Sequence, residues 1–481
     1  MSNLLFVAGI IIILSAFASK IGTRFGIPIL LIFMGIGIIA GGDCLELISL
    51  ADQELTRTIA NIALMFILFD SGFNTKKQHL KAHAGPSLTL ATLGIAVTAV
   101  ALGILIHFLL NQAWLFSFMI GAIISSTDAA AVMTVLRERP IVKRISSTLE
   151  IESAANDPMA ILLTLFMINL VLNSGEASAG DYVFFVVRLV WQFVGGILVA
   201  FACSKIAVWL YNHFKSENQG LFYVLYIGIV FATYGAADLL QANGVIAIFF
   251  TGYWMGNSTF VFQRGVSHFV SALSSFANMC VFLLLGLLVV PHSMVNVWRE
   301  GIVLAAALIL VARPVAVWIC LLPFRFRKRE MAFIAWGGLK GAVPVVLATY
   351  PAAYGLDPDG FVFNIVFFVV TFSCLIQGTT LAPFAKRLRF SVPKRSESPY
   401  SMELFSLDKT DFDVQCVPVT SKMPWLGKRI AELGLPEDIV ISSMVRDRKI
   451  ISPRGNTMVK EGDTLFILGK PSRVQEAVQV K

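Results

Sequence analysis

Long runs of apolar residues recur along most of this sequence. A helix needs roughly 20 mostly apolar residues to cross the hydrocarbon core of a bilayer, and about thirteen runs approach that length. They cover residues 4–20, 26–41, 57–73, 85–109, 113–136, 148–173, 182–211, 220–239, 242–258, 267–290, 300–323, 330–350 and 361–388. Of the 481 residues 57% are apolar and only 14% are charged, which is too few charges for a typical soluble fold. The pattern predicts an all-α polytopic membrane protein.

The connections between these runs alternate in charge. Every second connection collects lysine and arginine, as at Lys76 and Lys77, while the opposite connections carry acidic residues such as Asp43 and Asp357. Cation-rich connections predict the cytoplasmic side, so with an odd number of spans the N-terminus is expected outside and everything after Arg389 inside. These loops explain the net charge of +8, and no nucleic-acid partner is predicted.

The cysteines and histidines show no pattern that predicts chemistry. The six cysteines lie singly without a CxxC pair, and the six histidines have no ligand spacing. Buried single cysteines usually act as small apolar fillers. No nucleophile–base constellation is visible either, so the sequence predicts no cofactor, no dedicated metal centre and no enzyme activity.

Composition changes abruptly after Phe390. Residues 391–402 form a polar, proline-containing linker, and residues 403–481 look soluble, with alternating apolar runs separated by turn signals. We expect helices near Lys428–Leu433 and Arg473–Val480. The sequence therefore predicts a transmembrane domain over residues 1–390 and a small cytoplasmic α+β domain over residues 403–481.

Two of the apolar runs are interrupted by polar and helix-disturbing residues. The fifth contains SSTDAA at Ser125–Ala130, and the twelfth contains GGLKGAVP at Gly337–Pro344. If runs one to six and eight to thirteen are related halves, the two interruptions fall at corresponding places. Matching interruptions in two halves are the best sequence indication of a transporter site. We therefore expect inverted repeats in which two interrupted helices cross.

Asp157 is the charged residue that most strongly indicates a function. A charge near the bilayer centre costs roughly 2.5–3.5 kcal/mol even on a lenient scale, so it needs a partner or a role. Asp157 follows Asn156, and together they offer one carboxylate and one amide oxygen. Hard oxygen ligands with a single negative charge suit Na⁺ or K⁺ and are too weakly charged for a divalent cage. Such a carboxylate can hold a proton or a monovalent cation in turn, although permanent pairing with another span stays an alternative.

Other buried charges have structural explanations. Opposite charges on Glu152 and Arg313 predict an ion pair between spans. In the interrupted spans, Asp128 is expected to compensate the helix N-termini that meet and Lys340 the C-termini, with direct ion contact as the alternative. Thr127 and Ser126 are expected to add hydroxyl or backbone oxygens to a cation site, with hydrogen bonds to their own helix as the alternative. Asp70, near a span end, is expected to reach the interface.

Four motifs in this order carry a family resemblance. They are S-T-D at Ser126–Asp128, E-S-x-x-N-D at Glu152–Asp157, A-R at Ala312–Arg313 and G-G-L-K-G-A at Gly337–Ala342. Residues 1–390 resemble the monovalent cation:proton antiporters of the sodium/proton exchanger type. The resemblance implies a thirteen-helix inverted-repeat fold, a core domain that moves against a dimerisation domain, and homodimers.

The same resemblance implies roles for individual residues. It implies ion binding at Asp157 with Asn156 and Thr127, a bridge between Glu152 and Arg313, and crossover positions for Asp128 and Lys340. The Asn-Asp pair is similar to the electroneutral branch, whereas Lys340 departs from the many relatives that carry arginine there.

The tail resembles a different family. The pieces LGKRIAELGLP and PRGNT…EGDTLFILG within residues 403–481 are similar to the C-terminal subdomain of potassium-conductance regulatory proteins (TrkA-C-like). This subdomain implies dimerisation and, in some relatives, a small regulatory ligand. Both halves together resemble bacterial potassium/proton antiporters linked to cell-volume regulation. Many of those continue into a further cytoplasmic domain, which leaves open where the native chain ends.

The sequence thus predicts an antiporter in the bacterial cytoplasmic membrane that exports K⁺, or else Na⁺, in exchange for H⁺ by alternating access. The alternatives are a gated cation channel with a regulatory domain, for which no TVGYG-like filter is present, a membrane enzyme and an organic-solute symporter.

Overall fold

The computed structural model describes most of the chain. The described residues are 2–25, 28–41, 53–75, 77, 85–136, 141–173, 179–289, 291–295, 297–392, 402, 412–420, 423–447 and 449–479. The contacts divide the chain into two compact units. One contains residues 1–207, 224–258 and 269–393, and the other contains residues 208–223, 259–268 and 394–481. The predicted linker boundaries stay predictions, since most of residues 391–402 lie outside the described part.

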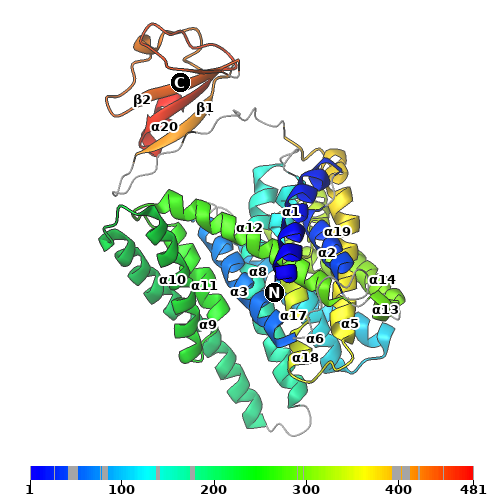
Figure 1. The fold of residues 1–481 in the computed structure, drawn as a ribbon. Helices are drawn as coiled ribbons and strands as arrows, with labels where there is room; N and C mark the ends of the chain where they lie inside the picture. The colour runs from blue at the N-terminus through cyan, green and yellow to red at the C-terminus, as the bar shows by residue number, and fades with distance from the viewer. Residues whose placement is uncertain are drawn as a thin grey trace. The chain divides into compact units, whose positions relative to one another are not determined.

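The regular elements that the structure describes in the first 390 residues are helices joined by short connections, as the apolar runs predict (Figure 1). The longer helices are α1 (Ser2–Phe25), α2 (Ile29–Ala40), α3 (Gln53–Asn74), α5 (Ile95–Leu110), α6 (Trp114–Ile124), α8 (Lys143–Leu172), α9 (Ala179–His213), α10 (Gln219–Leu239), α11 (Gly244–Gly256), α12 (Gln263–Leu288), α14 (Trp298–Ala307), α15 (Arg313–Leu321), α16 (Lys328–Trp336) and α19 (Phe361–Arg387). The shorter ones are α7 (Ala129–Val135), α13 (Pro291–Met294), α17 (Ala342–Leu347) and α18 (Tyr350–Ala353).

Seven helical segments in the described part of the chain are long and apolar enough to cross a membrane. They are Gly85–Leu110, Lys143–Leu172, Val187–His213, Gln219–Leu239, Gln263–Leu288, Trp298–Phe324 and Phe361–Arg387, and five shorter apolar helices accompany them. The helical membrane fold is therefore confirmed, whereas the number of thirteen spans stays a prediction. The two interrupted runs account for some of the short helices, because each is split into two pieces.

The splits fall where the polar residues lie in the sequence. The run that begins with α6 leaves helical geometry after Ile124 and resumes at Ala129 as α7. The run that begins with α16 leaves it after Trp336 and resumes at Ala342 as α17. Glycine and polar residues favour such breaks because they lower the stability of a continuous helix.

Two single π-helical turns support the predicted repeat. One covers Leu90–Gly94 in the fourth span, and the other covers Leu308–Ala312 in the eleventh. Turns of this kind are rare and often occur at functional positions. Counted as halves of six spans each, the two turns occupy corresponding places, as the two interruptions do.

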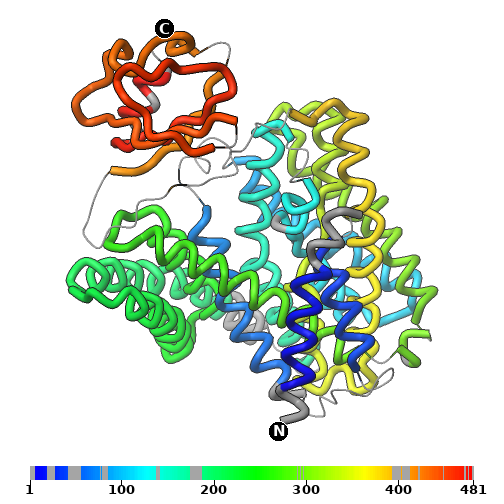
Figure 2. Tube along the Cα trace, turned by 45° about the horizontal axis from the view of Figure 1, so that its top comes forward, coloured from blue at the N-terminus to red at the C-terminus, as the bar shows by residue number. Residues whose placement is uncertain are grey.

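Glycines let some helices approach closely. A Cβ atom on Gly72 of α3 would lie 2.1 Å from the Phe249 carbonyl oxygen of α11, and one on Gly252 of α11 would lie 2.4 Å from the Phe69 carbonyl oxygen of α3. Larger residues at these positions would force the helices apart, so α3 and α11 form one closely packed pair. A separate pair, α1 and α2, lies side by side in dark blue in Figure 2, and α2 packs against α19.

The C-terminal domain is built on an antiparallel sheet of four strands. Its strands β1 (Asp413–Pro418), β2 (Val440–Arg446), β3 (Lys449–Ile451) and β4 (Thr464–Gly469) lie in the order β1-β4-β2-β3. Buried apolar side chains of the inner strands and of α20 (Pro471–Gln479), such as Met444, Leu465 and Val474, form its core. The helix expected near Lys428 is a 3₁₀ turn, Ile430–Glu432. The prediction of a small α+β domain is confirmed.

Candidate functional site

The first interrupted helix ends at a buried lysine of the second. The Lys340 side chain is fully buried, and its Nζ donates to the carbonyl oxygens of Ser125 (3.1 Å) and Ser126 (2.8 Å). These carbonyls lie just past the end of α6, where helix geometry leaves acceptors without partners and a partial negative charge. A cation at this point satisfies both the hydrogen bonds and the charge.

The two interrupted stretches also touch through their backbones. The Asp128 N–H donates to the Leu339 carbonyl oxygen at 2.7 Å. The Asp128 side chain caps α7, because its Oδ1 accepts from the Ala131 N–H at 3.0 Å. A Cβ on Gly341, just before α17, would lie 2.4 Å from Asp128 Oδ2, so the carboxylate lies directly against the start of α17. One aspartate thus lies at the N-terminal ends of both α7 and α17.

Glu152 and Arg313 meet inside the helical domain. Arg313 Nη1 lies 2.6 Å from Glu152 Oε1, and both side chains are at most 4% exposed. Arg313 begins α15 directly after the second π turn, while Glu152 lies on α8. Within the described residues, Arg313 Nε and Nη2 have no hydrogen-bond partner. The Glu152 carboxylate is therefore the main compensation that Arg313 has in a region of low dielectric.

A pocket of about 660 Å³ lies beside this crossing. Its walls come from α2, α3, α7, α8 and α12, from the interrupted stretch around Thr127, and from the first turn of α17. Its exposed lining residues Asn74 and Glu150 lie at the end of α3 and near the start of α8, whereas its buried lining residues Ser126 and Val343 belong to the broken helices. The pocket therefore leads from an accessible mouth to the broken helices.

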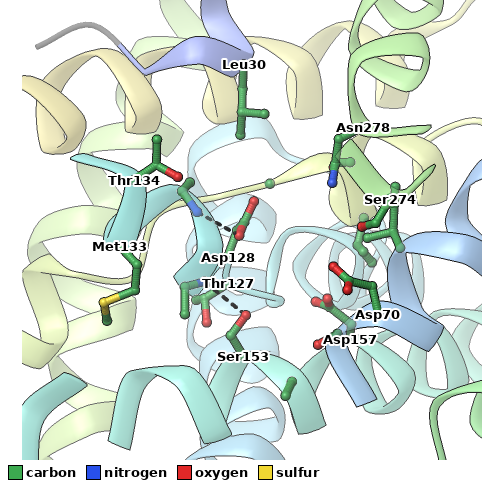
Figure 3. Close-up of a pocket in the computed structure, with 18 of the residues that line it drawn as sticks. Leu30, Asp70, Thr127, Asp128, Met133, Thr134, Ser153, Asp157, Ser274 and Asn278 are labelled. Carbon is green, nitrogen blue, oxygen red and sulfur yellow. Dashed lines mark hydrogen bonds between the residues drawn. The ribbon is translucent and has the colours of Figure 1, made fainter. Parts of the chain in front are cut away.

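Asp157 is on the wall of this pocket. Figure 3 shows its carboxylate facing the open space, close to Asp70. In the part of the chain that the structure describes, no group donates a hydrogen bond to it. Ser153, one turn earlier on α8, also lines the pocket, and its hydroxyl accepts from the Ala129 N–H at 2.9 Å. Asp157 is thus positioned by α8, and its carboxylate has no hydrogen-bond partner among the described residues.

The neighbouring polar residues divide between the pocket and the protein interior. Ser126 and Thr127 line the pocket, and within the described chain the Ser126 hydroxyl has no hydrogen-bond partner. Asn156 is 1% exposed, and its Nδ2 donates to Thr127 Oγ1 at 2.6 Å. This places Asn156 behind Thr127, as a support for that side chain. Direct cation contact by Asn156 stays a prediction.

Asp70 is the site residue that the sequence reasoning missed. We expected it to reach the interface, whereas it faces the pocket beside Asp157 (Figure 3). The Ser271 hydroxyl donates to Asp70 Oδ1 at 3.0 Å, the Asn74 side chain donates at 2.7 Å, and Ser274 lines the same pocket. The signal lay in α12, where Ser271, Ser274 and Asn278 recur at spacings of three and four, which is one helix face.

The chemistry of the pocket is that of oxygen ligands. The polar groups among its largely apolar lining are mainly carboxylates and hydroxyls, and among the described residues no group of three or more His, Cys, Asp or Glu side chains could hold a metal ion. Hard oxygen donors select alkali or alkaline-earth cations over transition metals.

Fold and site together define a class of protein. They are those of a polytopic transport domain with two crossed interrupted helices, joined to a small sheet domain. The chain belongs to the sodium/hydrogen exchanger family: the model of its transmembrane domain matches residues 10–387. The model of the TrkA-C domain matches residues 415–480. Both family resemblances of the sequence are confirmed.

The relatives include proteins named for cation exchange. The K⁺/H⁺ antiporter NhaP2 of Shewanella oneidensis is 34% identical over 466 residues, which cover 96% of this chain and 80% of the relative. The K⁺/H⁺ antiporter NhaP of Alkalimonas amylolytica is 32% identical over 98% of this chain and 82% of its own. The Na⁺/H⁺ antiporter NhaH of Halobacillus aidingensis is 27% identical over 73% of this chain and 90% of its own.

A solved structure shares the fold. The sodium proton antiporter MjNhaP1 from Methanocaldococcus jannaschii matches with a TM-score of 0.70 and 22% identity, over 80% of this chain and 98% of its own. This likeness supports the arrangement of the helices in the exchanger domain.

Proposed function

We propose that this protein exchanges a monovalent cation, K⁺ or else Na⁺, for a proton across a membrane, with Asp157 as the carboxylate that carries either. The observation behind the proposal is an Asp157 carboxylate that faces a pocket and, among the described residues, accepts no hydrogen bond. A cation or a proton can neutralise it, but not both together. The names of the relatives, which are K⁺/H⁺ and Na⁺/H⁺ antiporters, support cation:proton exchange.

Competition at one carboxylate couples the two fluxes. Loading a cation displaces the proton, and reloading the proton on the other side displaces the cation. Thr127 and Ser126 contribute hydroxyl oxygens to the bound cation, and Asn156 orients Thr127. One proton for one cation moves no net charge, so we propose electroneutral exchange. No feature of the described residues favours the gated channel that the sequence left open, and family membership supports a transporter over an enzyme.

The crossing provides the frame of this mechanism. We propose that Asp128 and Lys340 compensate the helix ends, and that the Glu152–Arg313 pair fixes α8 against α15. These charges then stay in place while the ion at Asp157 changes. In this mechanism, alternating access moves the crossing and the attached helices relative to α3 and its neighbours.

The wider setting is also a proposal. The family supports a bacterial cytoplasmic membrane, and the alternation of basic and acidic connections supports an N-terminus outside and a C-terminus in the cytoplasm. The family supports a homodimer, export of K⁺ from the cytoplasm, and a role in cell volume and pH control. The TrkA-C domain supports regulation by a small ligand bound within residues 403–481.

Proton movement in reconstituted vesicles tests the assignment. In proteoliposomes with an imposed ΔpH, adding K⁺ or Na⁺ should dissipate the gradient, and Asp157→Asn should reduce this to the level of empty vesicles. The matched control is Asp238→Asn, which makes the same change at an exposed residue of α10 outside the pocket. Exchange retained in Asp157→Asn would refute Asp157 as the carrier. Turnover that depends on membrane potential would refute electroneutrality.

A further inference from the structure

A hydrogen bond lies beyond the closed end of the pocket, away from its mouth. The pocket residues of α3 run from Ile67 to Asn74. Asn61 lies six residues before Ile67, which is about 9 Å further along the helix. There, the Tyr350 hydroxyl donates to Asn61 Oδ1 at 3.0 Å. Tyr350 begins α18, close behind α17, whose first turn forms the buried end of the pocket.

Between the pocket and this hydrogen bond the chain is apolar and buried. Leu64 of α3 is 2% exposed, and Val346 and Leu347 of α17 are fully buried, with α17 packed against α3. An ion cannot cross such a layer without losing its hydration. The far side of the pocket is therefore closed by apolar packing, with the Tyr350–Asn61 hydrogen bond at its outer edge.

The two partners lie on helices whose main neighbours differ, one group around α3 and the other around the crossing, although α17 also contacts α3. Asn61 is on α3, which packs closely on α11 through Gly72 and Gly252. Tyr350 follows the interrupted helix α17, which contacts α6, α8 and α19 around the crossing. Alternating access requires these two groups to move relative to each other around a fixed site. A contact that joins them on the closed side must break when that side opens.

We propose that Tyr350 and Asn61 form the gate of the pocket's far side, a pair whose hydrogen bond exists in the state seen here and breaks when the site opens the other way. The proposal rests on the antiport function given above. It assigns to Tyr350 a gating role without contact to the ion. The positive-inside pattern predicts that the pocket mouth faces the cytoplasm and this gate the outside.

Loss of the gate's hydrogen bond should change the half-saturating cation concentration differently on the two faces of the membrane. If the hydrogen bond stabilises only the state with the far side closed, removing it shifts the two states by about fivefold, given the net strength of an ordinary hydrogen bond. The half-saturating cation concentration on each face varies inversely with the population of the state open to that face. Their ratio therefore changes by the full factor, whatever the starting populations.

The experiment uses Tyr350→Phe, which removes the hydroxyl and keeps the ring. Cation-dependent proton movement is measured in right-side-out and everted membrane vesicles with the full chain, titrating K⁺ and Na⁺ separately. The far face should become easier to saturate and the near face harder, so that their ratio changes about fivefold. Tyr354→Phe, at an exposed tyrosine four residues later, is the matched control and should leave the ratio unchanged.

A double variant separates gating from general damage. Asn61→Ala should shift the ratio in the same direction, and Asn61→Ala with Tyr350→Phe should shift it no further than the larger single change, because both remove one interaction. An unchanged ratio in Tyr350→Phe, a parallel loss of affinity on both faces, or shifts that multiply in the double variant would overturn the gate alone. Absence of cation-dependent proton movement in the wild-type protein would overturn the antiport function as well.

Discussion

The charges at the crossing of the interrupted helices have fixed partners, whereas Asp157 in the pocket beside it has none among the described residues. At the crossing, Lys340 donates to two carbonyl oxygens, and Arg313 lies 2.6 Å from Glu152. In the pocket, the Asp157 carboxylate accepts no hydrogen bond from any described residue. A charge with a permanent partner is fixed, whereas a charge without one is free to take a mobile partner. The comparison distinguishes the charges that hold the helices together from the Asp157 carboxylate, at which ions exchange.

The largest expected effect is at the Glu152–Arg313 pair. Arg313→Ala leaves a buried carboxylate uncompensated, which should lower the free energy of unfolding by about 3–5 kcal/mol. Thermal unfolding in detergent measures this. The control is Glu152→Gln with Arg313→Met, which removes both charges and should be much less destabilising. If the single and double variants unfold alike, the pair is not the fixed charge that the comparison requires.

Lys340 should show the next largest effect. Lys340→Met removes the donor to the Ser125 and Ser126 carbonyls at the end of α6 and should destabilise the domain by about 2 kcal/mol. Transport should fall with the folded fraction. Lys340→Arg keeps the charge and the donors and should recover most of the stability. A stable Lys340→Met protein with normal exchange would show that the crossing does not need a cation.

Asp70 lies in the pocket beside Asp157, and its charge should affect ion affinity without affecting stability. Asp70→Asn removes a negative charge that faces the same pocket as Asp157. A unit charge a few ångströms away, at the effective dielectric of protein sites, contributes at least about 1.4 kcal/mol, or tenfold. The half-saturating K⁺ or Na⁺ concentration in vesicles should therefore rise about tenfold, with an unchanged unfolding temperature. Unaltered affinity would place Asp70 outside the ion's field.

Thr127 should have the smallest effect of the four. Thr127→Val removes the hydroxyl that lines the pocket and accepts from Asn156, a change worth about 1 kcal/mol or fivefold in cation affinity. Thr127→Ser keeps the hydroxyl and should stay near wild type. Equal cation affinities of the two variants in the same vesicle titration would mean that the Thr127 hydroxyl contributes nothing to cation binding, either directly or through its hydrogen bond from Asn156.

The sequence predicts the frame better than the pocket, for a physical reason. Charges and glycines within apolar runs are costly, so the amino-acid sequence alone indicates breaks and pairs at Asp128, Glu152, Arg313 and Lys340. Each of these effects is local to one span or joins two opposite charges. The structure places all four at or near the crossing.

The pocket depends on which helix faces meet. Asp70 lies near the end of α3 and has the pattern of an interface residue, and only the packing of α12 brings Ser271 to it. Asn156 is adjacent to Asp157 in sequence, but successive residues on a helix point about 100° apart, so its side chain turns to Thr127. Tertiary packing decides both positions, and one sequence does not contain that information in a local pattern.

Proton release on cation binding is the most direct test of the central claim. Purified protein in weakly buffered detergent solution is titrated with K⁺ or Na⁺ while the pH is recorded, at a pH where the site is protonated. If Asp157 holds either a proton or a cation, each cation that binds releases about one proton, because the ligand must be deprotonated. The Asp157→Asn variant should release none. Cation binding without proton release in the wild-type protein, or equal release by Asp157→Asn, would contradict the account.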